Sequence, residues 1–241
     1  MIQSIISWFY PDKCILCKRI LRREERRICD KCREALPYIT GPRCIHCSKP
    51  VGEEDRELCF DCERKHFSYQ KGFSLFVYQG AIKESMIDFK YRNCRDNRFF
   101  YGEELTKCFG DDWKRRGVQC IIPIPAHKSR VRTRGYNQAK LIAEQISVST
   151  GIPMDATLLI RNKKTLPQKE LSDTERLKNL TQAFAIDEQH FKKCQSLLPE
   201  TVLLVDDIYT TGSTVEACSR VLMAQGVKTV YFASVCIGKG M

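Results

Sequence analysis

The chain has 241 residues, 43% of them hydrophobic, and a formal net charge of +11. This length allows one core of ordinary size and a smaller accessory unit. No apolar run approaches the roughly 18 residues that cross a bilayer, so we expect no membrane span. The surplus of positive charge predicts a polyanionic partner or an anionic substrate.

The first eleven residues, MIQSIISWFYP, place four apolar side chains at helical spacing: Ile2, Ile5, Ile6 and Phe9. This pattern predicts a short amphipathic helix that docks on the protein itself. The segment lacks the basic start and small-residue cleavage site of a signal peptide, so we expect a cytoplasmic protein.

Eight of the fourteen cysteines form four C-x-x-C pairs, each separated from the next by eleven residues: Cys14/Cys17, Cys29/Cys32, Cys44/Cys47 and Cys59/Cys62. Two cysteines on one tight turn present both sulfurs to a single ion, and two such turns complete a tetrahedral thiolate site. A disulfide framework is disfavoured because no secretory signal is apparent. The pattern therefore predicts two structural Zn²⁺ sites.

The pairs repeat with a period of thirty residues, because CILC aligns with CIHC and RRICDKCRE aligns with RELCFDCER. The repeat unit spans two turns, residues 14–32 and 44–62, which favours one zinc ion within each unit. An interleaved arrangement stays open, and His46 is an alternative ligand inside one turn.

The two units differ in charge. Residues 12–35 carry nine basic and five acidic side chains, whereas residues 43–65 carry five and six. Four thiolates and one Zn²⁺ add two negative charges to each unit, which leaves about +2 and −3. Only the first unit, with KRILRREERR, is expected to contact a polyanion.

After residue 66 the pattern changes to alternating strands and helices. Strands are expected at GFSLFVYQ, CIIPIP, TVLLVDD and KTVYFASVCI, and helices at AIKESMIDFKY, NQAKLIAEQISVSTG and TVEACSRVLMAQG. Continuously apolar strands that alternate with helices imply a parallel sheet covered on both faces. We therefore expect two units, an N-terminal helix with a double zinc ribbon over 1–66 and an α/β domain over 67–241. Ligands of the second unit are expected at the carboxyl edge of its sheet.

The segment VLLVDDIYTTGST carries the strongest functional signal. A buried strand runs into two carboxylates, Asp206 and Asp207, and the chain then enters a helix near Thr214. A helix amino terminus offers unpaired N–H groups and a partial positive charge, which suit a phosphate. Carboxylates beside a phosphate suit sugar hydroxyls, so the segment predicts a ribose 5-phosphate site. Its phosphate-binding part, which we call the anion loop, comprises Thr210, Thr211, Gly212, Ser213 and Thr214.

This segment resembles the phosphoribosyl pyrophosphate (PRPP) motif of type I phosphoribosyltransferases. In that family the paired acids hold the ribose 2- and 3-hydroxyls and the following loop binds the 5-phosphate, with Mg²⁺ accompanying PRPP. Tyr209 stands where many members carry an aliphatic residue. The resemblance implies a type I phosphoribosyltransferase-like fold preceded by the double zinc ribbon.

A larger set of features is similar to the ComF (ComFC-like) family, phosphoribosyltransferase-like proteins associated with DNA uptake in competent bacteria. The features are the double ribbon, PIPAHKSRVRTRGYNQA, the spaced Gln168, Leu171, Arg176, Asn179 and Ala183–Phe184, and DDIYTTG. The resemblance covers essentially the whole chain. It does not disclose an acceptor substrate.

The resemblance implies roles for further residues. The loop after the first core strand faces the pyrophosphate, which makes Lys128, Arg132 and Arg134 candidate catalytic residues and Arg130 a candidate PRPP-binding residue. The segment 161–182 matches a mobile loop that closes over substrate, with Gln168, Arg176 and Asn179 as candidate contacts. Lys90, Arg92 and His127 receive no role.

Three functions are compatible with these features. The first is an enzyme that transfers the phosphoribosyl group of PRPP to an unknown acceptor. The second is a PRPP-sensing module without turnover. The third is a binding partner of single-stranded DNA and of the DNA-uptake machinery, such as its helicase or other competence proteins, recruited to the inner face of the membrane. The acid-free basic stretch 113–143 and the first ribbon favour DNA contact.

Overall fold

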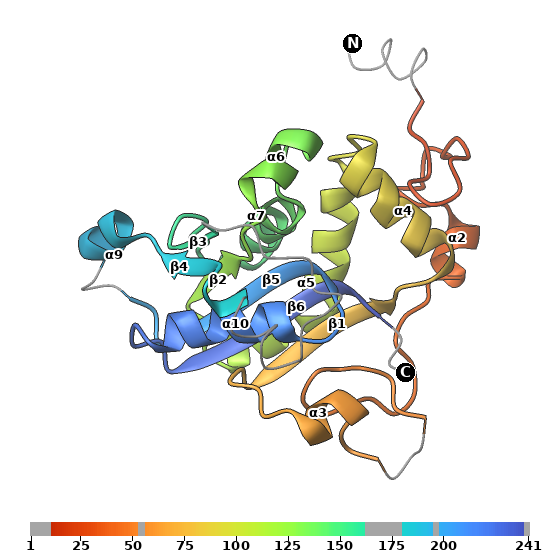
Figure 1. Cartoon of the computed structure of the whole chain (residues 1–241). Helices are drawn as coiled ribbons and strands as arrows, with labels where there is room; N and C mark the ends of the chain where they lie inside the picture. The colour runs from red at the N-terminus through yellow and green to blue at the C-terminus, as the bar shows by residue number, and fades with distance from the viewer. Residues whose placement is uncertain (1–10, 53–55, 162–179, 195–197, 239–241) are drawn as a thin grey trace.

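The computed structural model describes residues 11–52, 56–161, 180–194 and 198–238 (Figure 1). The expected N-terminal amphipathic helix lies outside the described residues. So does most of the segment 161–182, including Gln168, Arg176 and Asn179.

A four-stranded parallel sheet forms the centre of the fold. Its strands lie in the order β1 (Lys71–Val77), β6 (Thr229–Ile237), β5 (Thr201–Tyr209) and β2 (Cys120–Pro123). These are the four strands that the apolar runs predict. The strand β5 was expected to end at Asp206 and Asp207, but it continues for two more residues to Tyr209.

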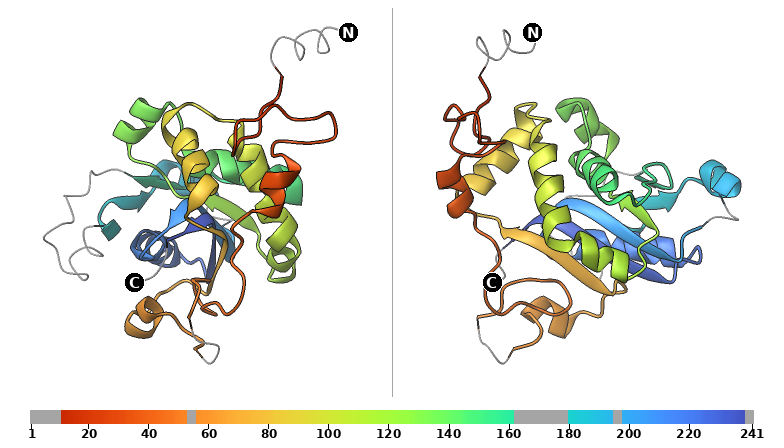
Figure 2. Two further views of the ribbon diagram at one scale, coloured as in Figure 1. Left: turned by 90° about the vertical axis from the view of Figure 1, so that its right-hand side faces the viewer. Right: turned by 180° about the vertical axis from the view of Figure 1, so that it is seen from behind.

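Helices cover both faces of the sheet (Figures 1 and 2). One face packs against α4 (Gly80–Tyr91), α5 (Asn97–Arg115) and α7 (Gln138–Thr150). The other packs against α10 (Ser213–Met223) and a small antiparallel pair, β3 (Leu159–Arg161) and β4 (Phe184–Ile186), which α9 (Glu188–Cys194) follows. The mixed α/β architecture is therefore confirmed. Neither α5 nor the β3–β4 pair is among the predicted elements.

The alternation of side chains along β5 explains why both faces are covered. Leu203 and Val205 point into the core on the α4, α5 and α7 side, whereas Val202 and Leu204 point into the core on the α10 side. All four are fully buried. Successive residues of a strand face opposite sides, so an uninterrupted apolar strand requires a packed layer on each side.

The thirty-residue repeat is visible in the backbone. The short helices α2 (Asp30–Glu34) and α3 (Phe60–Arg64) lie thirty positions apart. The bridges Lys13–Ile20 and Arg43–Pro50 are offset by the same interval, as are the positive φ angles of Lys18 and Ser48, 65° and 66°. The two ribbons are thus two copies of one structural unit.

The ribbons lie on opposite faces of the sheet (Figure 1). Buried residues of the first ribbon, such as Leu16 and Ile28, join the core on the α4 side, and Val51 of the second joins the core on the α10 side. The connecting segment pairs with the edge strand β1, because Val77 N–H donates to the Pro37 carbonyl at 3.0 Å. This cover removes an open sheet edge.

No helix in the described ranges is both long enough and apolar enough to cross a membrane.

Candidate functional site

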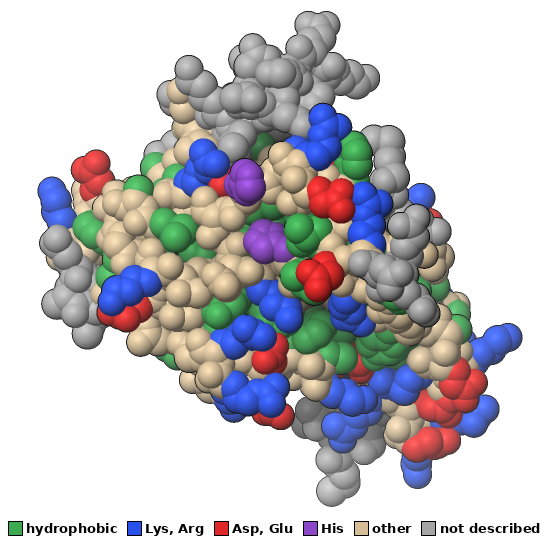
Figure 3. Space-filling view, turned by 90° about the horizontal axis from the view of Figure 1, so that it is seen from below, with side chains coloured by type: hydrophobic (Ala, Val, Ile, Leu, Met, Phe, Trp, Pro, Cys, Tyr) green, Lys and Arg blue, Asp and Glu red, His purple; other side chains and the backbone are tan. Residues whose placement is uncertain are grey.

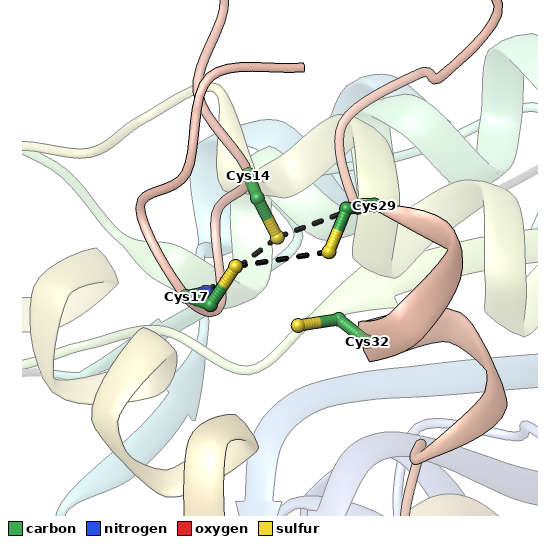
Figure 4. Close-up of side chains that lie close together, drawn as sticks. All are labelled: Cys14, Cys17, Cys29 and Cys32. Atoms are coloured by element: carbon green, nitrogen blue, oxygen red, sulfur yellow. Dashed lines mark hydrogen bonds between the residues drawn. The ribbon is translucent and has the colours of Figure 1, made fainter. Parts of the chain in front are cut away.

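Each ribbon gathers four cysteine sulfurs around one point. The groups are Cys14, Cys17, Cys29 and Cys32 in the first ribbon, shown in Figure 4, and Cys44, Cys47, Cys59 and Cys62 in the second. The sequential grouping is confirmed. Sulfurs bound to one Zn²⁺ at about 2.3 Å stand about 3.8 Å apart in a tetrahedron. The Cys17–Cys29 and Cys47–Cys59 sulfur distances, 3.7 and 3.5 Å, fit that geometry.

Backbone amides hold the thiolates in place. In the first ribbon the N–H groups of Cys17 and Cys29 point at the Cys14 sulfur, at 3.5 and 3.4 Å, and the Cys47 N–H points at the Cys44 sulfur in the same way. Such contacts fix the orientation of the sulfurs that would bind zinc. His46 is not one of the four groups, because its Nδ1 faces the Cys62 sulfur at 3.6 Å as a neighbour of the site.

A pocket of about 340 Å³ lies at the carboxyl edge of the sheet, and we call it the edge pocket. The end of β5, the start of α10, the segment after β2, α6 (Lys128–Arg134) and parts of β3 and α4 form its wall. Its charged lining consists of two carboxylates and four cationic side chains: Asp206, Asp207, Lys90, Arg130, Arg134 and Arg161. An excess of cations in a concave site favours an anionic ligand.

Asp206 and Asp207, at successive positions of β5, both line the edge pocket. The Asp207 N–H donates to the Asp206 carboxylate at 2.8 Å, and Lys90 Nζ lies 3.0 Å from Asp207 Oδ2. Burial, with the neighbouring charge of Asp207, raises the pKa of Asp206 to about 7. A ligand that binds at these two carboxylates must therefore replace the ion pair between Lys90 and Asp207.

The anion loop connects this acid pair to α10. Gly212 adopts φ 80° and precedes Ser213, the first residue of α10, so the free N–H groups of this helix begin after five residues that follow Asp207. Thr210 and Thr214 line the edge pocket, and the Thr211 and Ser213 hydroxyls lie 3.1 Å apart. The arrangement is the helix-terminus geometry that binds phosphate.

The basic residues after β2 form a helix, not the loop that the sequence suggested. In α6 the His127 Nδ1 accepts the Ser129 N–H at 3.1 Å and so caps the helix. Residues four apart share a helix face. Arg130 and Arg134 accordingly line the edge pocket together, while Lys128 and Arg132 are exposed and are not among its lining residues. The roles predicted for Lys128 and Arg132 stay predictions.

Two site residues had no role in the sequence analysis. Lys90 belongs to the sequence FKYR at the end of α4, and its ammonium group contacts the carboxylate of Asp207 on β5. Arg161 ends β3, and its guanidinium stacks 5.0 Å from the Phe184 ring while it lines the edge pocket. The basic FKYR motif was a usable signal for Lys90, whereas no local pattern marks Arg161. Arg92, next in the motif, pairs with Asp88 at 2.8 Å.

The basic residues of the acid-free stretch 113–143 are divided between the amino and carboxyl ends of the strands of the sheet. Lys114 and Arg115 end α5 just before β2 begins, and Arg130 and Arg134 follow its end. Arg116 is held by Asp112 at 3.2 Å and lies over Tyr231 at 5.5 Å. The stretch therefore does not form one continuous basic surface.

Comparison with known proteins places these features in one class. Residues 5–63 match the double zinc ribbon domain family. With the parallel sheet behind it, the chain is a double-zinc-ribbon α/β protein.

Similarity to individual proteins extends over most of the chain and is therefore more specific than the match to the ribbon domain. The chain is 29% identical to competence protein F of Haemophilus influenzae, over 92% of this chain and 95% of that protein. It is 28% identical to competence protein ComFC of Bacillus subtilis, over 86% and 82% respectively. It is also 31% identical to DNA utilization protein YhgH of Salmonella typhi over 48% of each chain. The expected resemblance is confirmed, and the chain is a homologue of competence protein F and ComFC.

The grouped sulfurs predict two zinc ions per chain. Protein purified without added metal should contain close to two equivalents by elemental analysis, because each ribbon supplies a complete set of thiolates. Cys14→Ser and Cys44→Ser should each lower the content to about one equivalent, since each change breaks a different site. A loss of both ions from either variant would contradict two independent sites.

Proposed function

We propose that the protein binds PRPP with Mg²⁺ in the edge pocket and acts in DNA uptake for natural transformation. The observation that carries the proposal is the composition of this one pocket. It joins a carboxylate pair, a helix amino terminus and four cations within about 340 Å³. The DNA-uptake role rests on relatives whose names refer to competence and to DNA utilization.

Each part of PRPP has a chemical counterpart in the pocket. The carboxylates of Asp206 and Asp207 accept hydrogen bonds from the ribose 2- and 3-hydroxyls. The five residues of the anion loop, Thr210, Thr211, Gly212, Ser213 and Thr214, bind the 5-phosphate. Arg130, Arg134 and Arg161 are assigned to the pyrophosphate, which carries the largest charge.

Lys90 has a separate assignment as the counter-ion of the acid pair. Its ammonium neutralises Asp207 while the pocket holds no ligand, and the ribose hydroxyls then share the carboxylate oxygens with it. Mg²⁺ bound with PRPP supplies charge neutralisation at the leaving group, and carboxylate oxygens are the ligands that it prefers.

Displacement of pyrophosphate from C1 by a nucleophilic acceptor is the reaction that such a pocket supports. The chain's contribution is to orient the ribose and to neutralise the leaving group by positioned cations. A PRPP-sensing module without turnover is the alternative, and it requires the same pocket. Pyrophosphate release with candidate acceptors distinguishes the two.

Replacement of the acid pair tests the ribose assignment. PRPP with Mg²⁺ at a hundredfold excess over its dissociation constant should stabilise the protein by about 2.7 kcal/mol, which a thermal shift measures. Asp206→Asn with Asp207→Asn should abolish the shift, because amides are poorer acceptors than carboxylates.

The matched control is the pair of adjacent carboxylates Asp111 and Asp112. They lie near the end of α5, shortly before β2 begins, at the end of the sheet away from the edge pocket. Changing both to Asn removes the same charge and should leave the shift intact. Equal shifts in the Asp206/Asp207 variant and the wild type would show that the ribose assignment is wrong.

Single-stranded DNA is a second proposed ligand, and the surface between the first ribbon and the edge pocket favours it. Lys18 of the first ribbon is paired with Asp88 of α4. At the end of α4, Tyr91 is 65% exposed, and the Arg134 guanidinium stacks 5.0 Å from its ring. Exposed aromatic rings beside arginines are platforms on which bases of single strands stack. Arg92 and Arg95 follow directly and are exposed.

The second ribbon offers less to a polyanion. Its Lys49 is buried and paired with Asp61 at 2.5 Å, and Arg56 is paired with Glu63 at 2.7 Å. Figure 3 shows the molecule from below, which is the side on which α3 lies in Figure 1. Basic and acidic side chains are interspersed on this face.

Three exposed arginines of the first ribbon test the DNA proposal: Arg22, Arg23 and Arg26. Their joint change to Ala should weaken binding of single-stranded DNA and reduce the slope of log affinity against log salt by about 2, because each phosphate contact contributes about 0.7. PRPP binding should not change. Lys114→Ala with Arg115→Ala, at the opposite edge of the sheet, should leave DNA binding nearly unaltered. DNA binding that is absent or insensitive to salt would remove this second function.

A further inference from the structure

The side chain of Tyr209 lies where the acid pair ends and the anion loop begins. It is 2% exposed, and its ring stacks on Phe232 with centroids 4.6 Å apart. Its hydroxyl is 2.7 Å from the hydroxyl of Tyr69, which is also buried. Burial raises the pKa of both phenols, so both stay protonated and one donates to the other. Each tyrosine therefore satisfies the buried polar group of the other.

The anion loop folds back onto this pair. A Cβ atom on Gly212 would overlap the Tyr209 hydroxyl oxygen and would stand 3.0 Å from the Phe67 ring. The positive φ of Gly212 and its close approach to Tyr209 belong to the same turn. The path of the loop thus depends on where Tyr209 and Phe67 lie.

Tyr69 and Phe67 belong to the segment that leads from the second ribbon into β1. The Tyr69 ring stacks on the His46 ring at 4.5 Å, and His46 Nε2 donates to the Tyr69 carbonyl at 2.8 Å. The other nitrogen of His46 faces the Cys62 sulfur at 3.6 Å. A contiguous series of contacts therefore runs from the second set of sulfurs through His46, Tyr69 and Tyr209 to Gly212.

A second contact fixes the start of α10 to the same segment. Glu216 in the first turn is 1% exposed and accepts hydrogen bonds from the Ser68 N–H at 2.6 Å and the Ser68 hydroxyl at 2.9 Å. Arg220 balances its charge at 2.6 Å. The second ribbon itself is bonded to β1, because Gly72 N–H donates to the His46 carbonyl at 2.7 Å.

The first ribbon is attached differently. Its side chains form ion pairs with α4 and α5, such as Arg27 with Glu103 at 3.1 Å and Arg33 with Glu104 at 2.9 Å. Within the described ranges, no hydrogen bond or ion pair joins residues 11–36 to residues 206–216. The two ribbons share one fold but differ in their connection to the site.

We propose that the second zinc ribbon positions the anion loop through Tyr69 and Tyr209, so that zinc binding at this ribbon and anion binding at the loop are coupled. The positioning of the anion loop by the second ribbon is a property of the fold, whereas its coupling to anion binding rests on the proposed function. Coupling between two binding sites is reciprocal, so a ligand in the loop also strengthens zinc binding at the second ribbon and not at the first.

Hydrogen exchange in the full chain tests the positioning without any ligand. In Tyr69→Phe, the amides of residues 209–216 should exchange about tenfold faster than in the wild type, because the variant leaves a buried Tyr209 hydroxyl without its partner. The matched control is Tyr101→Phe, which removes a buried hydroxyl bonded to Ser85 at 2.8 Å on the other face. It should leave exchange of 209–216 unchanged. Both variants should retain two zinc ions, which shows that the ribbons stay folded.

The coupling is measured by the zinc affinity of the protein in equilibrium competition with a chelator, with and without PRPP and Mg²⁺. PRPP should raise the zinc affinity of Cys14→Ser, which keeps only the second site, and not that of Cys44→Ser, which keeps only the first. Equal exchange of 209–216 in Tyr69→Phe and Tyr101→Phe would overturn the positioning. PRPP that binds without raising zinc affinity at the second site would overturn the coupling. PRPP that does not bind at all would contradict the proposed function, and the exchange result would still decide the positioning.

Discussion

The repulsion between two adjacent carboxylates at the end of a buried strand is the constraint on which the arrangement of the edge pocket depends. Asp206 and Asp207 are half-buried where they line the edge pocket, and unbalanced charge there is costly. Cations from separate elements converge on them, with Lys90 from α4 in direct contact with Asp207. Because these cations outnumber the carboxylates, the pocket retains positive charge for an anion after the acid pair is balanced.

Zinc binding stabilises the two ribbons. Each ribbon is too small to bury a core of its own, and metal–thiolate bonds replace the missing apolar burial. The ribbons then pack on opposite faces of the sheet and extend its two core layers. The two copies of the unit therefore contact different parts of the α/β domain. The first ribbon forms ion pairs with α4 and α5, whereas the second ribbon is connected to the start of α10 through aromatic rings and hydrogen bonds.

Local patterns in the sequence were sufficient for the four strands and for the position of Asp206, Asp207 and the start of α10 at one end of the sheet, and they favoured the sequential zinc sites that the structure shows. They failed where the determinant is tertiary. The helix α5 contains Gly102 and Gly110, which lower helix propensity, and Gly102 is so close to the Gln145 side chain of α7 that a Cβ would overlap it. The helix α6 has no apolar stripe, so its sequence reads as a loop. Lys90 meets Asp207 only because α4 and β5 end at the same sheet edge, and no spacing rule relates residues so distant in sequence.

Calorimetric titration with two sugar phosphates tests the proposal that Asp206 and Asp207 recognise ribose hydroxyls beside a bound phosphate. Ribose 5-phosphate and 2-deoxyribose 5-phosphate carry the same phosphate and differ by one hydroxyl. We expect the deoxy sugar to bind about tenfold more weakly, because a carboxylate loses its hydrogen-bond donor. We also expect Asp206→Asn with Asp207→Asn to remove most of this difference. Equal affinities of the wild-type protein for the two sugars would contradict recognition of the ribose hydroxyls by Asp206 and Asp207.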